Sequence, residues 1–486
     1  MIYGKEYYLN LFQVGVEELG SLAAKAMDAG GGYCDFYFEN TTYGSLSLRD
    51  GAVTSGGSHV DFGVGVRVLD GERTGYAYAE STAVEDIARC VEAASAIVSS
   101  GEERISVEVP SDGTLMRGRR FRGEPNPAAD RYPIIRSWRE IPASEHLPFL
   151  SRIESSVRAG RQDVVKVMAN LAYQVTDCLM YNSEGELKYD TRPIGSVSVT
   201  VIYSRGGRTE NKSVSRSFRM GAEMLSEALA DSIAADVTSG IDQRFGAIRP
   251  KGGRMTVVMG AGASGILLHE AIGHSFEADF IRKGQSVFTG RMGRKVCRDG
   301  IYVVDDATLR ANRGALNFDD EGVPGQKTYM VEDGVLTSYL HDRISAAHFG
   351  VAPTGNGRRE SFRYAPIPRM RATYMESVGA APEDIIADVR SGIYVDEFSN
   401  GQVKIGEGDF TFYVKSGYTI ENGRLAAPVK DINIIGNGPR ALADIVAVGN
   451  DLRVDDGAWT CGKEQSVPVS CGIPTVRVEN LVVGGQ

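Results

Sequence analysis

The chain has 486 residues and a formal net charge of −10. This length is enough for two or three domains with a sizeable core. The acidic balance argues against nonspecific binding to nucleic acid, whose phosphates attract a basic surface.

The sequence also carries signals about its compartment. Residues 1–6 lack a basic segment followed by an apolar one, which is the pattern of a secretory signal. No segment approaches the roughly 20 apolar residues that cross a bilayer. The six cysteines are scattered without close pairs, so we expect no disulfide framework. We therefore expect a cytoplasmic protein that binds neither membrane nor nucleic acid.

The first part of the chain alternates helical and strand patterns. The apolar spacing predicts an amphipathic helix over residues 14–29, ended by three glycines. Alternation of apolar and polar residues then predicts an antiparallel sheet and a second helix, with strands over 33–39, 43–49, 64–69 and 74–79 and the helix over 84–98. Residues 99–142 are rich in Pro, Gly and charge, so we expect a loop, an insertion or a partly ordered excursion there.

A second set of helices and strands follows and loosely resembles the first. The predicted helices cover 144–159 and 220–235, and the predicted strands cover 164–173, 178–182 and 196–204. Glycines and a proline between 236 and 253 mark a domain boundary. We therefore expect an N-terminal α+β domain over residues 1–240, built of helices and an antiparallel sheet.

Beyond that boundary the pattern is mostly short strands and glycine turns. Helical stretches are predicted near 340–349 and 440–447. A buried strand over 255–260 and a small-residue turn over 261–265 lead into a further helix. The prediction is an α+β protein whose C-terminal domain, residues 241–486, is mostly β and carries this helix.

The helix contains the run His269-Glu270-Ala271-Ile272-Gly273-His274. Two imidazoles flanking a glutamate are the side chains from which hydrolytic zinc sites are built, usually with the histidines at i and i+4. Here the spacing is i and i+5, which separates the two side chains by roughly 140° on a regular helix. Both rings reach one ion only if the helix widens or ends between them. Gly273 is the place where that distortion is easiest.

A catalytic zinc site needs three protein ligands and an open fourth position. The candidates for the third ligand are Cys297, Cys461 and Cys471, and spacing alone does not choose among them. Glu277 and Asp279 follow the second histidine. They are either partners that orient an imidazole or solvated acids at a helix end.

The segment over 355–360 places Arg358 and Arg359 after two glycines. It is no P-loop, since it lacks the Gly-Lys-Ser/Thr ending. It is either a tight turn with solvated arginines, or a site where Arg358 or Arg359 holds a substrate carboxylate or a buried acid. The acidic run over 319–321 lacks the spacing of an oxygen-ligand cation loop.

Several separated blocks, in the same order, resemble the TldD/PmbA family of peptidases, and specifically its TldD branch, over most of the chain. They are HEAIGH at 269–274 with FEADF at 276–280, DDEGVPG at 319–325, VAPTGNGRRES at 351–361, PRM at 368–370, TYM at 373–375, CGK at 461–463 with VPV at 467–469, and VENL at 478–481. One block alone would not be specific, but the ordered set is.

The resemblance implies a zinc-dependent peptidase whose Zn²⁺ is held by His269, His274 and Cys461, with Glu270 as the general base that activates water. It also implies short or unfolded peptide substrates, bound as an added strand. The expected assembly is a homodimer, or a heterodimer with a PmbA/TldE-type paralogue that lacks the histidines. Two alternatives stay open: a noncatalytic peptide-binding or assembly subunit, and a structural metal whose fourth position is closed by Cys471 or an acid.

Overall fold

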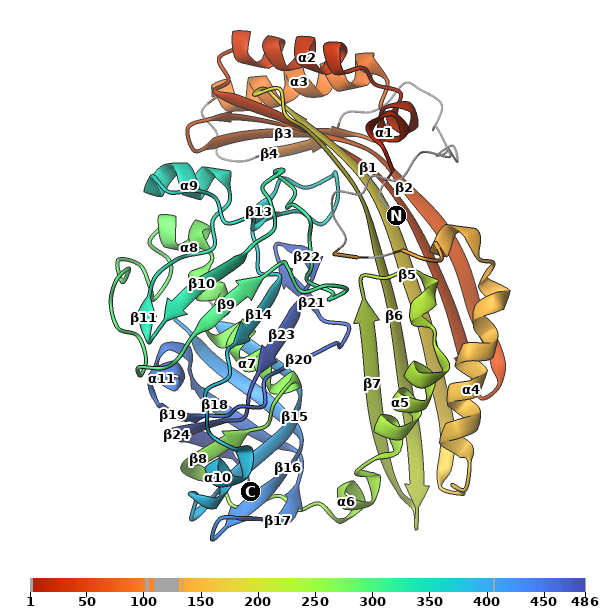
Figure 1. Ribbon diagram of the computed structural model, residues 1–486, viewed down its shortest axis with the longest axis vertical. Coiled ribbons are helices and arrows are strands. Elements are labelled where there is room, and N and C mark those ends of the chain that lie inside the picture. Colours follow the sequence, from red (N-terminus) through yellow and green to blue (C-terminus); the bar gives the residue numbers. More distant parts are fainter. Residues whose placement is uncertain (1–2, 101–104, 109–130, 133, 405–406, 486) are drawn as a thin grey trace.

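The computed structural model describes residues 3–100, 105–108, 131–132, 134–404 and 407–485. Its architecture is α+β, as predicted, with helices packed on one large sheet and a C-terminal half made mostly of strands (Figure 1). Most of the predicted excursion over 99–142 lies outside the described residues. Within this stretch the structure describes the strand β4 (Ile105–Glu108) and the short 3-10 helix η1 (Trp138–Glu140), and a second 3-10 helix, η2 (Ala143–His146), follows directly after the stretch.

Seven strands of the N-terminal half form a single sheet in the order β4-β3-β2-β1-β5-β6-β7. All neighbours are antiparallel except β3 and β4. The other six strands are β1 (Tyr33–Arg49), β2 (Ala52–Asp70), β3 (Arg73–Ala79), β5 (Val164–Asn182), β6 (Leu187–Arg205) and β7 (Arg208–Phe218). The two strands predicted over 33–49 are one, because the polar residues Asn40 and Thr41 stay paired with β2 and β5.

Two groups of helices cover different stretches of these long strands (Figure 1). Near one end, α1 (Lys5–Phe12), α2 (Val16–Asp28) and α3 (Val84–Ser100) enclose one hydrophobic core. Further along the strands, α4 (Leu147–Arg158) and α5 (Glu227–Thr238) enclose a second core. The helix predicted over 220–235 is in fact the 3-10 helix η3 (Ala222–Met224) followed by α5, because Ser226 caps α5 by accepting a hydrogen bond from the Leu229 N–H.

The C-terminal half contains two larger sheets. One has six strands in the order β11-β10-β9-β14-β23-β20. In the other, β15-β8-β24-β18-β16 close into a ring, since β15 also pairs with β16, and β17 and β19 extend it. The strands are β8 (Gly253–Met259), β9 (Val303–Asp306), β10 (Lys327–Glu332), β11 (Val335–Leu336), β14 (Ala372–Met375), β15 (Ser391–Lys404), β16 (Asp409–Glu421), β17 (Arg424–Val429), β18 (Ile432–Asn437), β19 (Ile445–Val448), β20 (Arg453–Val454), β23 (Ser470–Ile473) and β24 (Val476–Gly484).

Short helices and two hairpins complete the C-terminal half. The hairpins are β12 (Gly357–Arg358) with β13 (Ile367–Pro368), and β21 (Thr460–Lys463) with β22 (Gln465–Pro468). The helices are α6 (Ile241–Gly246), α7 (Ile266–Ala271), α8 (Ala278–Arg282), α9 (Arg343–Phe349), α10 (Pro382–Ala387) and α11 (Gly438–Ala443), with the 3-10 helices η4 (Ala263–Gly265) and η5 (Gly273–Phe276) around α7. Among the described residues, none of the helices is long and apolar enough to span a bilayer.

Buried ion pairs join the two halves. The guanidinium of Arg67, on β2, is fully buried and donates to Asp35 in its own half and to Glu321 in the other. Arg192, on β6, pairs in the same way with Asp320. Because a buried charge is costly without its partner, these contacts hold the large sheet against the C-terminal half, which carries His269 and His274.

Candidate metal centre

The predicted interruption of the motif helix is present. The α-helix α7 ends at Ala271, Ile272 leaves the helical region with φ −128° and ψ −48°, and a 3-10 turn continues from Gly273. The break rotates the second part of the motif relative to the first. Both histidines are therefore buried on the same side of the segment, with their ring centroids 5.1 Å apart.

The helix breaks at Ile272, one residue before the predicted position, and Gly273 is required by space rather than by its backbone angles. A Cβ at this position would lie 2.2 Å from the sulfur of Met370. A larger residue would force either Met370 or the motif away from its place. Since Leu267 and Leu268 pack into the core of the C-terminal half, the motif has no room to move as a whole.

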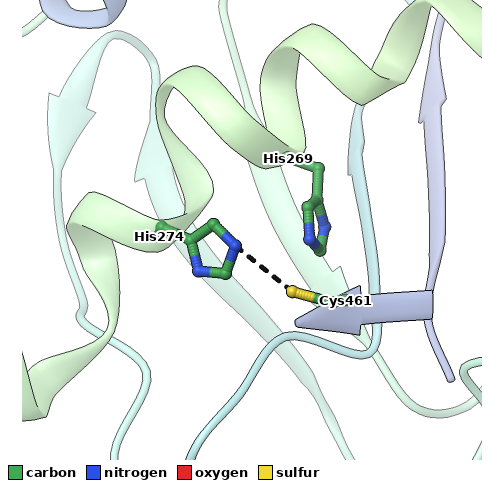
Figure 2. A group of neighbouring side chains, drawn as sticks. All are labelled: His269, His274 and Cys461. Carbon is green, nitrogen blue, oxygen red and sulfur yellow. Dashed lines mark hydrogen bonds between the residues drawn. The ribbon is translucent and has the colours of Figure 1, made fainter. Parts of the chain in front are cut away.

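Cys461 is the cysteine that the fold brings to the histidines. It lies on β21, and its sulfur is 3.2 Å from Nε2 of His274. The three donor atoms of His269, His274 and Cys461 all lie within 4.8 Å of one another, and Figure 2 shows both rings directed toward the cysteine. The two competing cysteines, Cys297 and Cys471, pack in the hydrophobic core instead.

The donor set fits a metal ion. His269 is 1% exposed, yet neither of its ring nitrogens has a hydrogen-bond partner among the described residues. A buried imidazole without partners is rare unless something else satisfies it. Two imidazole nitrogens and one thiolate are the ligand types of a catalytic zinc site that keeps its fourth position open.

The electrostatic surroundings of Cys461 favour its thiolate form, which is the form that binds metal ions. Burial opposes ionisation of the Cys461 thiol, but the neighbouring imidazoles of His269 and His274 lower its pKa to about 4. The thiol is therefore a thiolate at neutral pH. For the other five cysteines burial is the largest effect, and it raises their pKa values.

Glu277 contacts the ring of His274. Of the two roles proposed from the sequence, an orienting partner or a solvated acid, this contact matches the first. Oε2 of Glu277 accepts a hydrogen bond from Nδ1 of His274 at 2.8 Å and lies 3.0 Å from Nζ of Lys463. Burial disfavours its charge, yet Lys463 and His274 hold the pKa of this carboxyl well below its usual range. Burial alone would lower the pKa of His274. The charges of Glu277 and of the Cys461 thiolate outweigh burial and raise this pKa to about 10 in the metal-free chain. Asp279 contacts Lys463 at 2.7 Å and no imidazole.

Glu270 differs from its neighbours by its access to water. Its side chain is 25% exposed, whereas the side chain of His274 is 4% exposed, and the two approach to 3.8 Å at Oε2 and Nε2. A carboxylate at the exposed side of a buried donor set is placed to take a proton from a water molecule.

The predicted arginines lie in the protein interior. Arg358 donates to the carbonyls of Met370 and Pro468, and burial lowers its pKa to about 9. Arg359 donates to the carbonyl of Asp320 and stacks over the ring of Tyr37 at 4.3 Å. The interpretation of a turn with solvated arginines is therefore wrong, because both side chains are buried. A contact between either arginine and a substrate carboxylate stays a prediction.

The acidic run over 319–321 has protein partners. Asp319 accepts from the backbone N–H groups of Glu321, Val323 and Gly357. Asp320 and Glu321 take part in the ion pairs that join the two halves. These carboxylates therefore serve the fold.

Two residues that contact the centre had no role assigned from the sequence. Lys463 bridges Glu277 and Asp279, and Arg369 binds the hairpin that carries Cys461. Both fall inside blocks of the family resemblance, PRM and CGK, which was the only signal available. Lysine and arginine are normally exposed, so their type alone predicts no burial.

Comparison with known proteins agrees with the family resemblance found in the sequence. Family models match over three stretches: PmbA/TldA metallopeptidase domain 1 over 34–98, the central domain over 136–239 and the C-terminal domain over 252–485. A metalloprotease TldD homolog from Haemophilus influenzae is 37% identical over 459 residues, which cover 93% of each chain. The predicted boundary at residue 240 stays a prediction.

Solved structures share the fold. A Thermotoga maritima protein described as a candidate modulator of a DNA gyrase aligns with a TM-score of 0.74 and 22% identity, covering 96% of this chain and 99% of that one. TldE from Thermococcus kodakarensis aligns with a TM-score of 0.71 and 16% identity, covering 96% of this chain and 100% of that one.

Proposed function

Because this chain belongs to the PmbA/TldD family of metallopeptidases, and to its TldD branch, we propose that it is a zinc-dependent peptidase that hydrolyses short or unfolded peptides. The observation that carries the proposal is the donor group of His269, His274 and Cys461 with the partly exposed Glu270 beside it. A catalytic zinc site takes three protein ligands, and this group offers three donors of suitable types.

Each side chain has a role in the proposed reaction. His269, His274 and Cys461 would hold the metal. When bound, zinc supplies Lewis-acid chemistry, since it makes water acidic enough to give hydroxide near neutral pH and polarises a carbonyl group. Glu270 accepts the proton of the attacking water and passes it to the departing amine. Glu277 holds the His274 ring so that Nε2 faces the metal position.

We also propose a cytoplasmic location and a dimer, either of two identical chains or with a PmbA/TldE-type paralogue that lacks the histidines. Native mass spectrometry of the purified protein, alone and mixed with such a paralogue, distinguishes the two assemblies. A monomer in both samples contradicts the dimer.

The test of the peptidase measures bound zinc and hydrolysis of a library of unstructured peptides. The samples are the native protein, Glu270→Gln, Cys461→Ala and the control Cys471→Ala, which removes a buried cysteine outside the donor group. We expect Glu270→Gln to keep zinc and lose about 10²- to 10⁴-fold in rate, Cys461→Ala to lose both, and Cys471→Ala to keep both. Native protein that holds zinc and cleaves nothing, with and without a partner, supports the structural-metal or binding-subunit alternative instead.

A further inference from the structure

One guanidinium, that of Arg369, binds three carbonyls of the β21–β22 hairpin on which Cys461 lies, whereas Arg358 and Arg313 each contact only one end of it, at Pro468 and Thr460. Arg369 is fully buried. Its Nη1 donates to the carbonyls of Lys463 (3.1 Å) and Gln465 (2.6 Å), and its Nη2 donates to that of Cys461 (2.6 Å). Three carbonyls of one short hairpin thus converge on one side chain.

The shape of the hairpin explains this convergence. Lys463 pairs with Gln465, so the turn between the strands is the single residue Glu464, with φ +56°. A two-stranded hairpin is marginally stable by itself. A guanidinium is a rigid planar fork of five donors, whereas an ammonium is a point charge. The arginine therefore fixes the hairpin in a way that lysine at the same position does not.

Arg369 also lies beside Glu277, on the histidine side of the centre. Its Nε is 4.0 Å from Oε1 of Glu277, the carboxylate that orients His274, and the next backbone N–H, of Met370, donates to the same oxygen at 3.3 Å. The arginine is itself anchored, since its N–H donates to the carbonyl of Asn356. Arg369 is therefore at the junction between the histidine segment and the cysteine hairpin.

We propose that Arg369 is a positioning residue that places the Cys461 sulfur opposite His274 before the metal binds, an inference that rests on the metal centre of the proposed function. Pre-placing a donor removes the cost of ordering the hairpin when the ion arrives. Groups that orient metal ligands affect metal affinity by about 10- to 100-fold.

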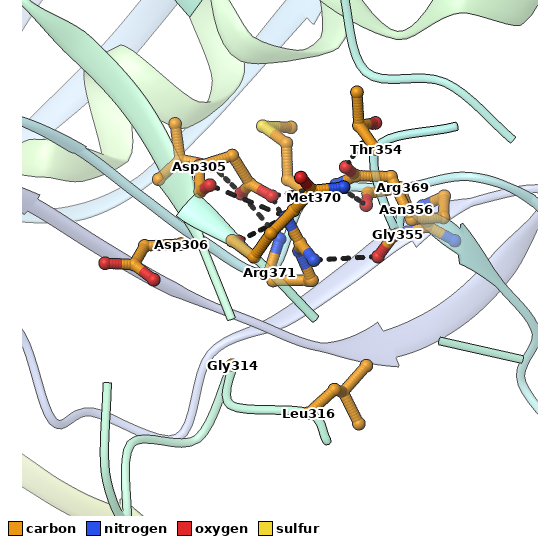
Figure 3. Close-up of polar contacts among 12 residues, drawn as sticks. Asp305, Asp306, Gly314, Leu316, Thr354, Gly355, Asn356, Arg369, Met370 and Arg371 are labelled. Atoms are coloured by element: carbon orange, nitrogen blue, oxygen red, sulfur yellow. Dashed lines mark hydrogen bonds and ion pairs between the residues drawn. The ribbon is translucent and has the colours of Figure 1, made fainter. Parts of the chain in front are cut away.

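The chain offers a closely matched control. Arg371, two residues further on, is also fully buried, but it donates to Asp305 and to the carbonyl of Gly355 (Figure 3). It also donates to the carbonyl of Gln326. Among the described residues, its guanidinium donates no hydrogen bond to the hairpin. Arg371→Lys therefore removes a buried guanidinium from the same segment and leaves the hairpin bonds intact.

The test is a Co²⁺ titration of the full-length native protein, Arg369→Lys, Arg369→Gln and Arg371→Lys, with circular dichroism to confirm folding. Cobalt reports the thiolate directly through its sulfur-to-metal charge-transfer absorbance. We expect both Arg369 variants to bind Co²⁺ about 10- to 100-fold more weakly and to lose much of that absorbance, and Arg371→Lys to match the native protein. Folded Arg369 variants with native absorbance and affinity overturn the inference.

Two further outcomes separate the test of Arg369 from the test of the proposed metal centre. A native protein that shows no charge-transfer absorbance contradicts the donor set of the proposed function itself, not the role of Arg369 alone. If neither Arg369 variant folds, hydrogen exchange of the native chain decides. Exchange over 460–468 that changes less than about threefold on adding zinc supports a preset hairpin, and a larger slowing overturns it.

Discussion

The Nδ1 atom of His274 lies 2.8 Å from Oε2 of Glu277, while Nε2 of the same ring lies 3.2 Å from the sulfur of Cys461. Since a carboxylate only accepts, the bond to Glu277 keeps a proton on Nδ1. The nitrogen left for a metal is the one that faces the cysteine. Orientation of this ring thus depends on Glu277 and on Lys463, which holds Glu277 in its charged form.

The first prediction concerns this orienting contact. Glu277→Gln removes the charge that holds the His274 ring and leaves Lys463 with one acid fewer, so we expect zinc affinity to fall about 10- to 100-fold. Competition with a zinc chelator measures it. Asp279→Asn is the control, because Asp279 contacts Lys463 but no imidazole. An affinity for Glu277→Gln within twofold of native contradicts the orienting role.

The second prediction uses the ionisation of Cys461. In the metal-free chain the two imidazoles lower its pKa to about 4, so the thiolate is present at every pH above that value. Iodoacetamide at pH 6 should therefore label Cys461, while Cys297, whose pKa burial raises to about 12, stays unlabelled. Mass spectrometry locates the label, and bound zinc should prevent it. Labelling of Cys461 only above pH 8 contradicts the low pKa.

The third prediction concerns a buried acid between the two halves. Glu39 accepts from the N–H of Phe362 and from the hydroxyl of Thr41, and burial raises its pKa from 4.5 to about 7. The folded chain thus keeps a proton that the unfolded chain releases above pH 4.5. Stability should fall as pH rises through 4.5–7, by about 3 kcal/mol at most.

Glu39→Gln tests this pH dependence. The amide keeps both bonds, since the Thr41 hydroxyl also contacts Thr176 at 2.8 Å and can donate there while accepting from the variant. We expect the unfolding temperature of the variant, relative to native, to be higher at pH 8 than at pH 5. A difference that is the same at both pH values contradicts the raised pKa.

The fourth prediction concerns the joint between the halves. Arg67→Met leaves the buried carboxylates of Asp35 and Glu321 without their shared cation, so we expect a loss of about 3–5 kcal/mol in the free energy of unfolding by urea. Arg152→Ala, which breaks exposed pairs with Asp231 and Glu227, should change little. Equal effects of the two substitutions contradict the importance of burial.

The sequence predicted the fold class and the interruption of the motif helix from local patterns. It did not predict the length of the strands. Residues 33–39 and 43–49 read as two strands because Asn40, Thr41 and Thr42 interrupt the apolar pattern. In the structure Asn40 and Thr41 are buried but bond to polar side chains, Asn40 to Asp177 and Thr41 to Glu39 and Thr176, so polar residues belong there. A contact between distant segments leaves no local periodicity.

The candidate site was likewise predicted from the sequence only in part. The spacing of His269 and His274 with Gly273 predicted a shared ion, whereas Cys461 came from the family resemblance alone. Arg358 and Arg369 are both buried arginines in neighbouring blocks, and only the structure shows that Arg369 binds the carbonyl of Cys461 itself, whereas Arg358 binds those of Met370 and Pro468. Residue type cannot distinguish them, because their roles depend on which carbonyls the fold brings to each.

The donors of the centre come from opposite ends of the C-terminal half, with most of its strands between His269 and Cys461. During synthesis the histidines therefore leave the ribosome long before the cysteine. A chain interrupted between them carries two imidazoles and no thiolate, and it also lacks the hairpin that Arg369 binds. The proposed donor set is thus complete only when translation of this half is nearly finished.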